Sequence, residues 1–200
     1  MQLDHLVVAG ETLEEAVAHV EDALGVAMGP GGEHSRFGTH NRLLGLADGI
    51  YLEAIAINPD ATPQNTPRWF GLDEFRGAPR LITWAARVSD LSDALATYPL
   101  AGNCIDMQRG DLRWRMSVAS DGGLPLNGAF PSLLEWQVTP IPSDLLPASG
   151  CALKRLSVTS PMAASHFPTV SAKPQIEFTL GGELRLDALF QTPKGERVLA

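Results

Sequence analysis

The sequence has few of the residues that mark several common classes of protein. Its 200 residues include two cysteines, Cys104 and Cys151, which lie far apart and form no CxxC pair. A zinc knuckle or a disulfide framework therefore has no support. We expect both cysteines to be free, buried thiols.

Basic clusters and long apolar runs are also missing. The net charge is −8 and the pI is about 5.0, so a nucleic acid is an unfavourable partner. No run of about 18 apolar residues occurs, which argues against a membrane-spanning helix. The first ten residues lack the basic start of a signal peptide. We expect a cytoplasmic protein that binds neither nucleic acid nor membrane.

Motifs of the large nucleotide-binding and hydrolytic families are absent as well. The sequence contains no GxSxG, no GxxxxGK[ST] and no HExxH, and no GxGxxG follows its first strand. Its apolar fraction of 44% and charged fraction of 19% are ordinary for a folded globular protein. Its length allows one core or two small, closely packed modules.

What is present begins with a strand, a helix and three further strands in residues 1–60. LDHLVVAG predicts the first strand, and Thr12 with Glu15 has the spacing of a capping box at the start of a helix. Gly25 is placed to end that helix. The later stretches predict strands joined by a tight hairpin turn at Asp48-Gly49.

The same order of elements returns after a Pro-rich linker, residues 61–79. Residues 80–142 predict a strand in RLITWAARV, a short helix capped by Asp90 or Ser92, a hairpin in NCIDMQRGDLRWRMSVA and a fourth strand in LLEWQVTP. Such a repeat indicates two βαβββ modules that bury their sheet faces against each other.

The rest of the chain, residues 143–200, predicts a small β-rich extension. Three strand-like stretches occur there, and Gly181-Gly182 is a favourable turn between the last two. We expect this extension to pack on the second module.

Three polar side chains interrupt apolar strand faces and are the main candidates for chemistry. His5 lies in the first strand, Glu53 in the fourth strand of the first module and Glu135 at the matching place in the second. Imidazole and carboxylate groups suit a divalent Zn, Mn, Fe, Co or Ni ion. Each residue could equally be a core side chain bonded to its neighbours, and the duplicated placement is what favours a shared site.

Several stretches together resemble one family. LDHLVV, GGEHSRFGTHNRL, YLEAIA, GDLRWRMSVA and LLEWQ are similar to the glyoxalase-like domain of the vicinal-oxygen-chelate (glyoxalase/bleomycin resistance/dioxygenase) superfamily, over about residues 1 to 140. The resemblance implies an α+β fold in which paired βαβββ modules form a cup.

The resemblance also implies a metal site. Metal ligands in this superfamily come from the first and fourth strand of each module, which match His5, Glu53 and Glu135 here. The fourth ligand position falls on Trp84, which cannot coordinate a metal. Three ligands can still bind a metal and leave open positions for substrate.

Further residues are candidates to hold or activate a substrate. His34 is a candidate general base, because an unperturbed imidazole titrates near pH 6.5. Thr39 and Asn41 share one strand face and are placed to orient a substrate, and Arg113 and Arg115 share another that suits a carboxylate. Candidate pocket aromatics are Trp69, Phe70, Trp84 and Phe130. Solvated strand faces and ordinary core aromatics remain the simpler alternatives.

The leading hypothesis is a metal-dependent lyase or isomerase that acts on a small oxygenated molecule. The metal would polarise vicinal oxygens and stabilise an enolate-like intermediate, and Glu53 or Glu135 would move the proton. The alternative is a non-catalytic small-molecule binding protein in which Trp84 stacks on the ligand. A mainly structural subunit is a third reading, and a homodimer is left open.

Overall fold

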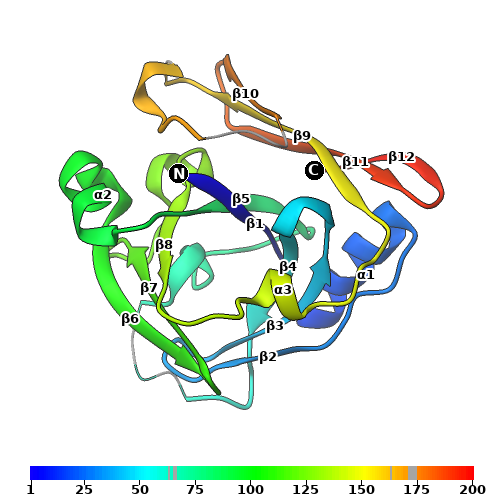
Figure 1. Cartoon of the computed structure of the whole chain (residues 1–200), viewed down its shortest axis with the longest axis horizontal. Coiled ribbons are helices and arrows are strands. Elements are labelled where there is room, and N and C mark those ends of the chain that lie inside the picture. Colours follow the sequence, from blue (N-terminus) through cyan, green and yellow to red (C-terminus); the bar gives the residue numbers. More distant parts are fainter. Residues whose placement is uncertain (63, 65–66, 163, 171–174) are drawn as a thin grey trace.

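The computed structural model describes residues 1–62, 64, 67–162, 164–170 and 175–200. An eight-stranded sheet curls around on itself, and a separate four-stranded sheet lies across one side of it (Figure 1). None of the helices in these residue ranges is long and apolar enough to cross a membrane.

The helix of the first half is capped at both of its ends. Thr12 Oγ1 accepts a hydrogen bond from the Glu15 amide and the Glu15 carboxylate accepts one from the Thr12 amide, as the capping box predicts. Gly25, with φ at 69°, ends the helix in the left-handed conformation. The elements are β1 (Gln2–Ala9), α1 (Leu13–Leu24), β2 (Gly31–His34), β3 (Thr39–Gly45), η1 (Ala47–Gly49) and β4 (Tyr51–Ile57).

The second half repeats this order. Asp90 caps its helix by accepting a hydrogen bond from the Asp93 amide. The elements are β5 (Arg80–Arg87), α2 (Leu91–Thr97), η3 (Pro99–Ala101), β6 (Asn103–Arg109), β7 (Leu112–Val118), η4 (Pro125–Gly128) and β8 (Ser132–Trp136). The segment between the halves contains η2 (Trp69–Gly71), and residues 63 and 65–66 of the expected linker lie outside the described residues.

The two halves join through their first strands. The sheet order is β2-β3-β4-β1-β5-β8-β7-β6, in which β1 is antiparallel to β5 while β1 is parallel to β4 and β5 is parallel to β8. The strands of the second half therefore follow the same order outward from the β1–β5 pair as those of the first half. The fold class predicted from the sequence, paired βαβββ modules with a C-terminal β extension, is confirmed. The exact residues at which one module ends and the next begins stay predictions.

One turn differs from its expected form. Asp48 and Gly49 do adopt the left-handed conformation, with φ of 62° and 69°. They belong to the short η1 helix between β3 and β4, however, and Leu46 and Ile50 close the loop through a backbone hydrogen bond. The hairpin connection is therefore longer than the predicted two-residue turn.

The C-terminal sheet is made of β9 (Ala152–Ser160), β10 (Gln175–Leu180), β11 (Arg185–Thr192) and β12 (Gly195–Leu199). The short helix α3 (Pro142–Leu145) precedes this sheet, and the short helix η5 (Ala164–His166) follows β9. Its order is β10-β9-β11-β12. Strands β10 and β11 thus lie on opposite sides of β9, so Gly181-Gly182 does not join a paired hairpin as predicted. The sequence pattern also gave no indication of β12.

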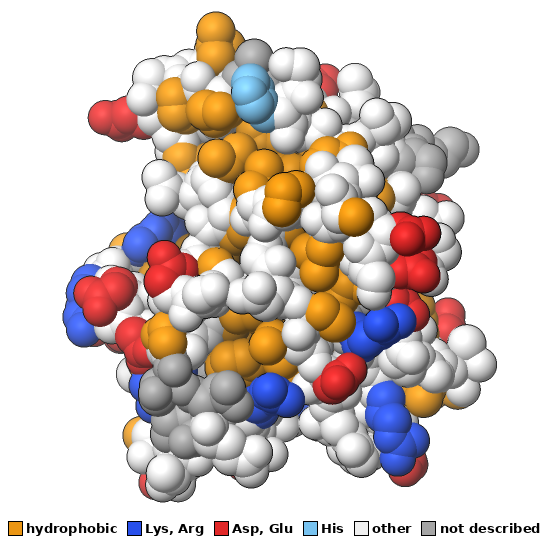
Figure 2. All heavy atoms as spheres, turned by 90° about the vertical axis from the view of Figure 1, so that its left-hand side faces the viewer, with side chains coloured by type: hydrophobic (Ala, Val, Ile, Leu, Met, Phe, Trp, Pro, Cys, Tyr) orange, Lys and Arg blue, Asp and Glu red, His pale blue; other side chains and the backbone are white. Residues whose placement is uncertain are grey.

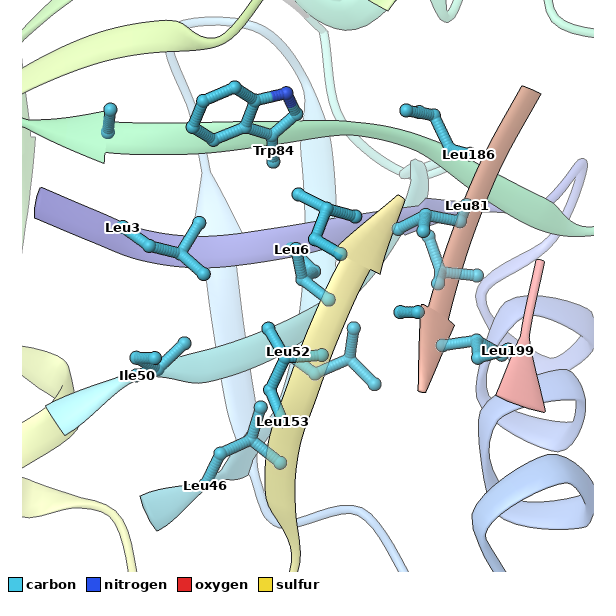
Figure 3. Close-up of a cluster of buried hydrophobic side chains, with 14 of the residues drawn as sticks. Leu3, Leu6, Leu46, Ile50, Leu52, Leu81, Trp84, Leu153, Leu186 and Leu199 are labelled. Atoms are coloured by element: carbon cyan, nitrogen blue, oxygen red, sulfur yellow. The ribbon is translucent and has the colours of Figure 1, made fainter. Parts of the chain in front are cut away.

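This small sheet packs across both halves of the large sheet. Leu6 of β1, Leu52 of β4 and Trp84 of β5 are buried on the face that meets Leu153 of β9 and Leu186 of β11 (Figure 3). The extension thus packs on the second module, as expected, and on the first module as well. The opposite face of the large sheet, inside its curl, has a separate core that includes Val7, Ile55 and Leu134.

The outer surface shows no basic patch on the side formed by α2 and β6. Figure 2 shows apolar side chains in a band down the middle of this side, with charged side chains of both signs at its margins. Both cysteines are free thiols, and Cys151 is buried as expected while Cys104 is exposed.

Candidate functional site

Four buried polar side chains of the large sheet, those of His5, His34, Asn41 and Glu53, line one small cavity inside its curl. The cavity has a volume of about 30 Å³, room for one or two water molecules. It is lined by His5, His34, Asn41, Leu43, Tyr51, Glu53, Trp69, Phe70, Arg109, Trp114, Met116, Leu134, Trp136 and Pro142. Titratable groups from both halves of the sheet therefore share one apolar-walled space.

Asp4 and His5 form a buried pair at the edge of this space, of which His5 lines the cavity. Strand β1 has an irregular register between Leu3 and His5, and such a bulge re-aims side chains so that Asp4 and His5 can meet. His5 Nδ1 lies 2.7 Å from Asp4 Oδ1, and because a carboxylate only accepts, Nδ1 carries the proton of this hydrogen bond. The His5 ring also stacks on Tyr51, with 4.5 Å between the ring centroids.

Asp4 itself is held as a carboxylate by three neighbours. Burial raises the pKa of Asp4, but hydrogen bonds and charge from His5, the Trp136 indole N–H and Arg87 outweigh it and leave the pKa below its usual value. The Asp4 carboxylate therefore stays charged, and its hydrogen bond with Nδ1 orients the His5 ring.

Glu53 faces His5 from β4. Its Oε2 lies 3.5 Å from His5 Nε2, and both side chains are buried, with 5% of each residue exposed. Asn41 donates from Nδ2 to Glu53 Oε1 at 2.5 Å, and its Oδ1 accepts from Arg109 at 3.2 Å. Asn41 thus joins a carboxylate of the first half to a guanidinium of the second.

His34 lies in the same network but is held neutral. Its Nδ1 lies 3.1 Å from Thr39 Oγ1, and its Nε2 lies 3.3 Å from Arg109 Nη1. Burial, and then the positive charge of Arg109, lower the pKa of His34 to about 3. Thr39 also accepts a hydrogen bond from the Trp69 indole N–H at 3.2 Å.

Aromatic rings form the walls. The rings of Trp69 and Phe70 stack with 4.9 Å between their centroids. The rings of Trp114 on β7 and Trp136 on β8 pack against each other with 5.4 Å between their centroids. Burial and the carboxylates of Asp4 and Glu53 raise the pKa of Tyr51 well above its usual value, so Tyr51 stays protonated. Such apolar walls lower the local dielectric and strengthen electrostatic interactions inside the cavity.

The structure separates Glu135 from this site. On β8, Leu134 and Trp136 face the cavity, so Glu135 points to the opposite side of the sheet. There its Oε2 accepts hydrogen bonds from the Leu91 amide at 2.8 Å and from Arg115 at 2.8 Å. The predicted convergence of His5, Glu53 and Glu135 is therefore wrong, because the alignment of the two modules was shifted by one residue.

The same one-residue shift displaces Trp84. His5 lies opposite Ala85 in the β1–β5 pair, and Trp84 lies opposite Leu6 on the other face. Trp84 is fully buried there and donates to the Ala129 carbonyl at 3.0 Å. Neither Trp84 nor Phe130, which belongs to the same core, lines the cavity as expected.

The two arginines of β7 also face away from the cavity. Arg113 is exposed, and Arg115 pairs with Glu135. The alternation predicted around Trp114 is present, but the cavity takes the indole in place of the guanidinium groups. The expected carboxylate clamp of Arg113 and Arg115 is therefore not formed in this cavity.

Three polar residues of the site, Asp4, Tyr51 and Arg109, were not among the candidates predicted from the sequence. Asp4 stands beside His5, where strand alternation predicts opposite faces, and only the bulge brings them together. Arg109 belongs to the β6–β7 hairpin, where a turn was the expected role. Of the predicted site residues, the structure brings together His5, His34, Thr39, Asn41 and Glu53, with Trp69 and Phe70 as walls.

The donor set of this cavity does not fit the metal expected from the sequence. Among the described residues, no three or more His, Cys, Asp or Glu side chains are placed to hold a metal ion. At the matching strand positions of the second half, the apolar Ala85, Leu134 and Trp136 face inward. The guanidinium of Arg109 in the same cavity would also repel a divalent cation.

Comparison with known proteins identifies a family. A family model described as "Glyoxalase-like domain" matches residues 3–172. No curated protein sequence matches the chain.

Solved structures share the fold at low sequence identity. A hypothetical protein from Staphylococcus aureus is 11% identical with a TM-score of 0.61, over 92% of this chain and 88% of that one. Methylmalonyl-CoA epimerase from Mycobacterium tuberculosis is 17% identical with a TM-score of 0.46, over 70% of this chain and 89% of that one. A Streptomyces coelicolor methylmalonyl-CoA epimerase variant is 15% identical with a TM-score of 0.45, over 69% and 99% of the two chains. At these identities the likeness concerns the fold alone.

Proposed function

The chain belongs to the glyoxalase-like domain family of the vicinal-oxygen-chelate superfamily, and from this premise we propose that it is a lyase or isomerase that holds the reactive end of a small oxygenated molecule in the cavity of the curled sheet. It moves a proton on that molecule with its own side chains in place of a metal. The observation that carries the proposal is the Asp4–His5 pair, because the Asp4 carboxylate holds Nδ1 of His5 and turns Nε2 toward Glu53 and the cavity.

His5 is the proposed general base. Asp4 fixes the proton of His5 on Nδ1 and stabilises the imidazolium that forms when Nε2 takes a proton. Glu53, 3.5 Å from Nε2, is placed to pass that proton on or return it. Glu53 thereby keeps part of the role expected from the sequence, whereas Glu135 has none.

Arg109 is the proposed stabiliser of negative charge. When His5 takes a proton from the carbon beside a carbonyl, the electron pair of the C–H bond moves to the carbonyl oxygen. A guanidinium in a dry, apolar-walled cavity stabilises such an enolate oxygen. Returning the proton to the opposite face of that carbon, or to another atom of the enolate system, completes an isomerisation, and loss of a neighbouring leaving group completes an elimination.

His34 has a supporting role in this scheme. With a pKa of about 3 it is a weak base near neutral pH, so the predicted role of general base passes to His5. Neutral His34 accepts from Arg109 and, with Thr39 and Asn41, holds the guanidinium in place.

Solvent deuterium exchange tests the proposal even while the natural substrate is unidentified. The full chain is incubated in D₂O with a panel of small 2-oxo and 2-hydroxy carbonyl compounds, and deuterium at carbon is followed by NMR. We expect exchange that a chelator does not reduce, and a loss of roughly 10²- to 10⁴-fold in the His5→Gln variant. His19→Gln is the matched control, because His19 lies half-buried on α1, does not line the cavity and bonds to the Ala200 carbonyl.

Two outcomes would contradict the scheme. Exchange that stops with chelator and returns with added metal would assign the chemistry to a metal ion. Equal exchange in the His5→Gln and His19→Gln variants would remove His5 as the base. An Asp4→Asn variant separates positioning from binding, since we expect it to lower the exchange rate and change its pH profile while leaving the binding of the compound in place.

A second candidate function is non-catalytic binding of a small molecule, as the sequence also allowed. The three indoles of Trp69, Trp114 and Trp136 around the cavity favour it, because flat aromatic walls suit ligand stacking. Saturable binding of a panel compound by calorimetry, with no deuterium exchange in that compound, would support this function over catalysis.

A further inference from the structure

A second and much larger cavity lies beside the first. Its volume is about 660 Å³, within the usual range for small-molecule sites. It is lined by Phe70, Gly71, Glu74, Phe75, Arg80, Leu81, Ile82, Leu124, Asn127, Leu184, Arg185, Leu186 and Ala200. The polar cavity around His5, at about 30 Å³, is too small for most metabolites.

The large cavity is formed by parts of the chain that are far apart in sequence. Leu81 and Ile82 of β5 and Leu124 form one wall, and Leu184 and Leu186 at the start of β11 form the other. The C-terminal sheet therefore completes the cavity, and most of the lining is apolar. An apolar body of a ligand would gain free energy by leaving water here.

Phe70 is the residue that the two cavities share. Its backbone has a φ of 58°, which is a costly conformation for a bulky residue. Asn127, on the opposite part of the large cavity, has the same φ of 58°. Strained backbone of this kind is concentrated at ligand sites, so its presence here supports a binding role.

Arg80 supplies a cation to the large cavity. Its guanidinium lies over the Phe75 ring, 4.2 Å from the centroid, and its Nη1 donates to the carbonyls of Arg76 and Ala78. Within the described residues no carboxylate lies at ion-pair distance from it. The other cation of the lining, Arg185, already pairs with Asp187, and Glu74 is the lining carboxylate across from them.

We propose that the large cavity binds the apolar body of the ligand, with an anionic group of the ligand at Arg80, while the reactive end passes Phe70 into the polar cavity around His5. This rests on the proposed function for the choice of reactive end. The ligand is then an amphipathic anion with an aromatic or aliphatic body. The C-terminal sheet takes part in binding it, through Leu184 and Leu186.

The test uses 1-anilinonaphthalene-8-sulfonate, a fluorescent probe with an aromatic body and one sulfonate. The full chain is titrated with the probe, which is excited directly, and amide shifts are followed by NMR. We expect saturable binding at one site, with shifts centred on Gly71, Leu124 and Leu184. Leu184→Glu places a charge in the apolar wall and should weaken binding about tenfold, whereas Leu180→Glu, at an exposed leucine of the same sheet, should not.

The cation is tested by a second pair of variants. Arg80→Gln should weaken probe binding about tenfold, and Arg197→Gln, an exposed arginine on β12, should leave it unchanged. Shifts centred elsewhere, or equal affinity in Leu184→Glu and Leu180→Glu, would overturn the proposal. The His5→Gln variant should bind the probe normally, so a failed exchange experiment and a failed binding experiment can be told apart.

Discussion

At the scale of single residues, the site is defined by which polar groups keep their charge when they are buried. Asp4 has three donors around it and stays ionised, whereas His34 faces Arg109 and stays neutral. The same burial therefore produces one charged anchor and one neutral acceptor, because their neighbours differ.

The low pKa of His34 predicts a loss of stability in weak acid. An unfolded histidine titrates near pH 6.5 and His34 in the fold at about 3, so below about pH 6.5 the unfolded chain binds a proton that the folded chain does not. Stability is complete above that pH and falls as the pH drops toward 3, by up to about 1.4 kcal/mol per pH unit. Asp4 adds a loss of the same sign at lower pH, below its usual pKa, because its pKa is lowered.

Urea unfolding of the wild type and of His34→Gln checks this. The difference in unfolding free energy between them should shrink by about 2 kcal/mol between pH 7 and pH 5. A difference that stays constant over this range would show that His34 takes up its proton equally in both states.

Strand alternation predicted part of the site correctly at this scale. His5 and Glu53 lie on apolar strand faces, and both do face the cavity. Glu135 and Trp84 were misplaced because a shift of one residue moves a side chain to the other face of a sheet. The bulge at Asp4 could not be predicted either, since no local pattern marks it.

At the scale of elements, Glu135 has a structural task in place of a catalytic one. Its carboxylate accepts the Leu91 amide at the first turn of α2 and also binds Arg115 on β7. These donors outweigh the effect of burial and lower the pKa of Glu135. The side chain thereby ties α2 to the outer face of the sheet.

Replacing Glu135 should affect stability and leave the site intact. We expect Glu135→Gln to lower the free energy of unfolding by about 1 kcal/mol, because a charged acceptor becomes a neutral one. Deuterium exchange by the folded variant should be unchanged. Chemical denaturation against Glu183→Gln, an exposed glutamate in the loop before β11, provides the measurement. A Glu135→Gln variant that folds normally but shows no deuterium exchange would mean that Glu135 does take part in the reaction.

Elements whose ends are set by neighbouring residues in the sequence were predicted correctly. The capping box at Thr12, the end of α1 at Gly25 and the repeated element order are all confirmed. The arrangement of the C-terminal strands was not predictable, because β10 pairs with β9 across a long connection and β12 has few apolar residues.

At the scale of the whole molecule, the C-terminal sheet and the large sheet share one core. Phe190 of β11 and Leu156 of β9 are fully buried in the same cluster as Trp84 and Leu6. Unfolding one sheet would expose the apolar face of the other, so we expect one cooperative transition.

The variant Phe190→Ala tests this cooperativity. It should lower the unfolding free energy by about 3–5 kcal/mol, and the midpoint by tryptophan fluorescence should move with the midpoint by circular dichroism. All four tryptophans lie outside the C-terminal sheet, so an unmoved fluorescence midpoint would mean that the sheets unfold separately. Val198→Ala, at a residue 58% exposed on β12, is the control. A homodimer, a cytoplasmic location and the absence of a nucleic-acid partner stay predictions at this scale.

The two outer strands of the large sheet, β2 and β6, are not hydrogen-bonded neighbours in the sheet, yet side chains join them. Arg36, just after β2, donates to the Asp106 carbonyl at 2.8 Å, and Arg109 of β6 reaches His34 and Asn41. The curl is thus fastened by two arginines, and one of them also belongs to the reaction site. A ligand that binds the Arg109 guanidinium would compete with His34 and Asn41 for its N–H groups, so ligand binding and the contact between the outer strands would be energetically coupled.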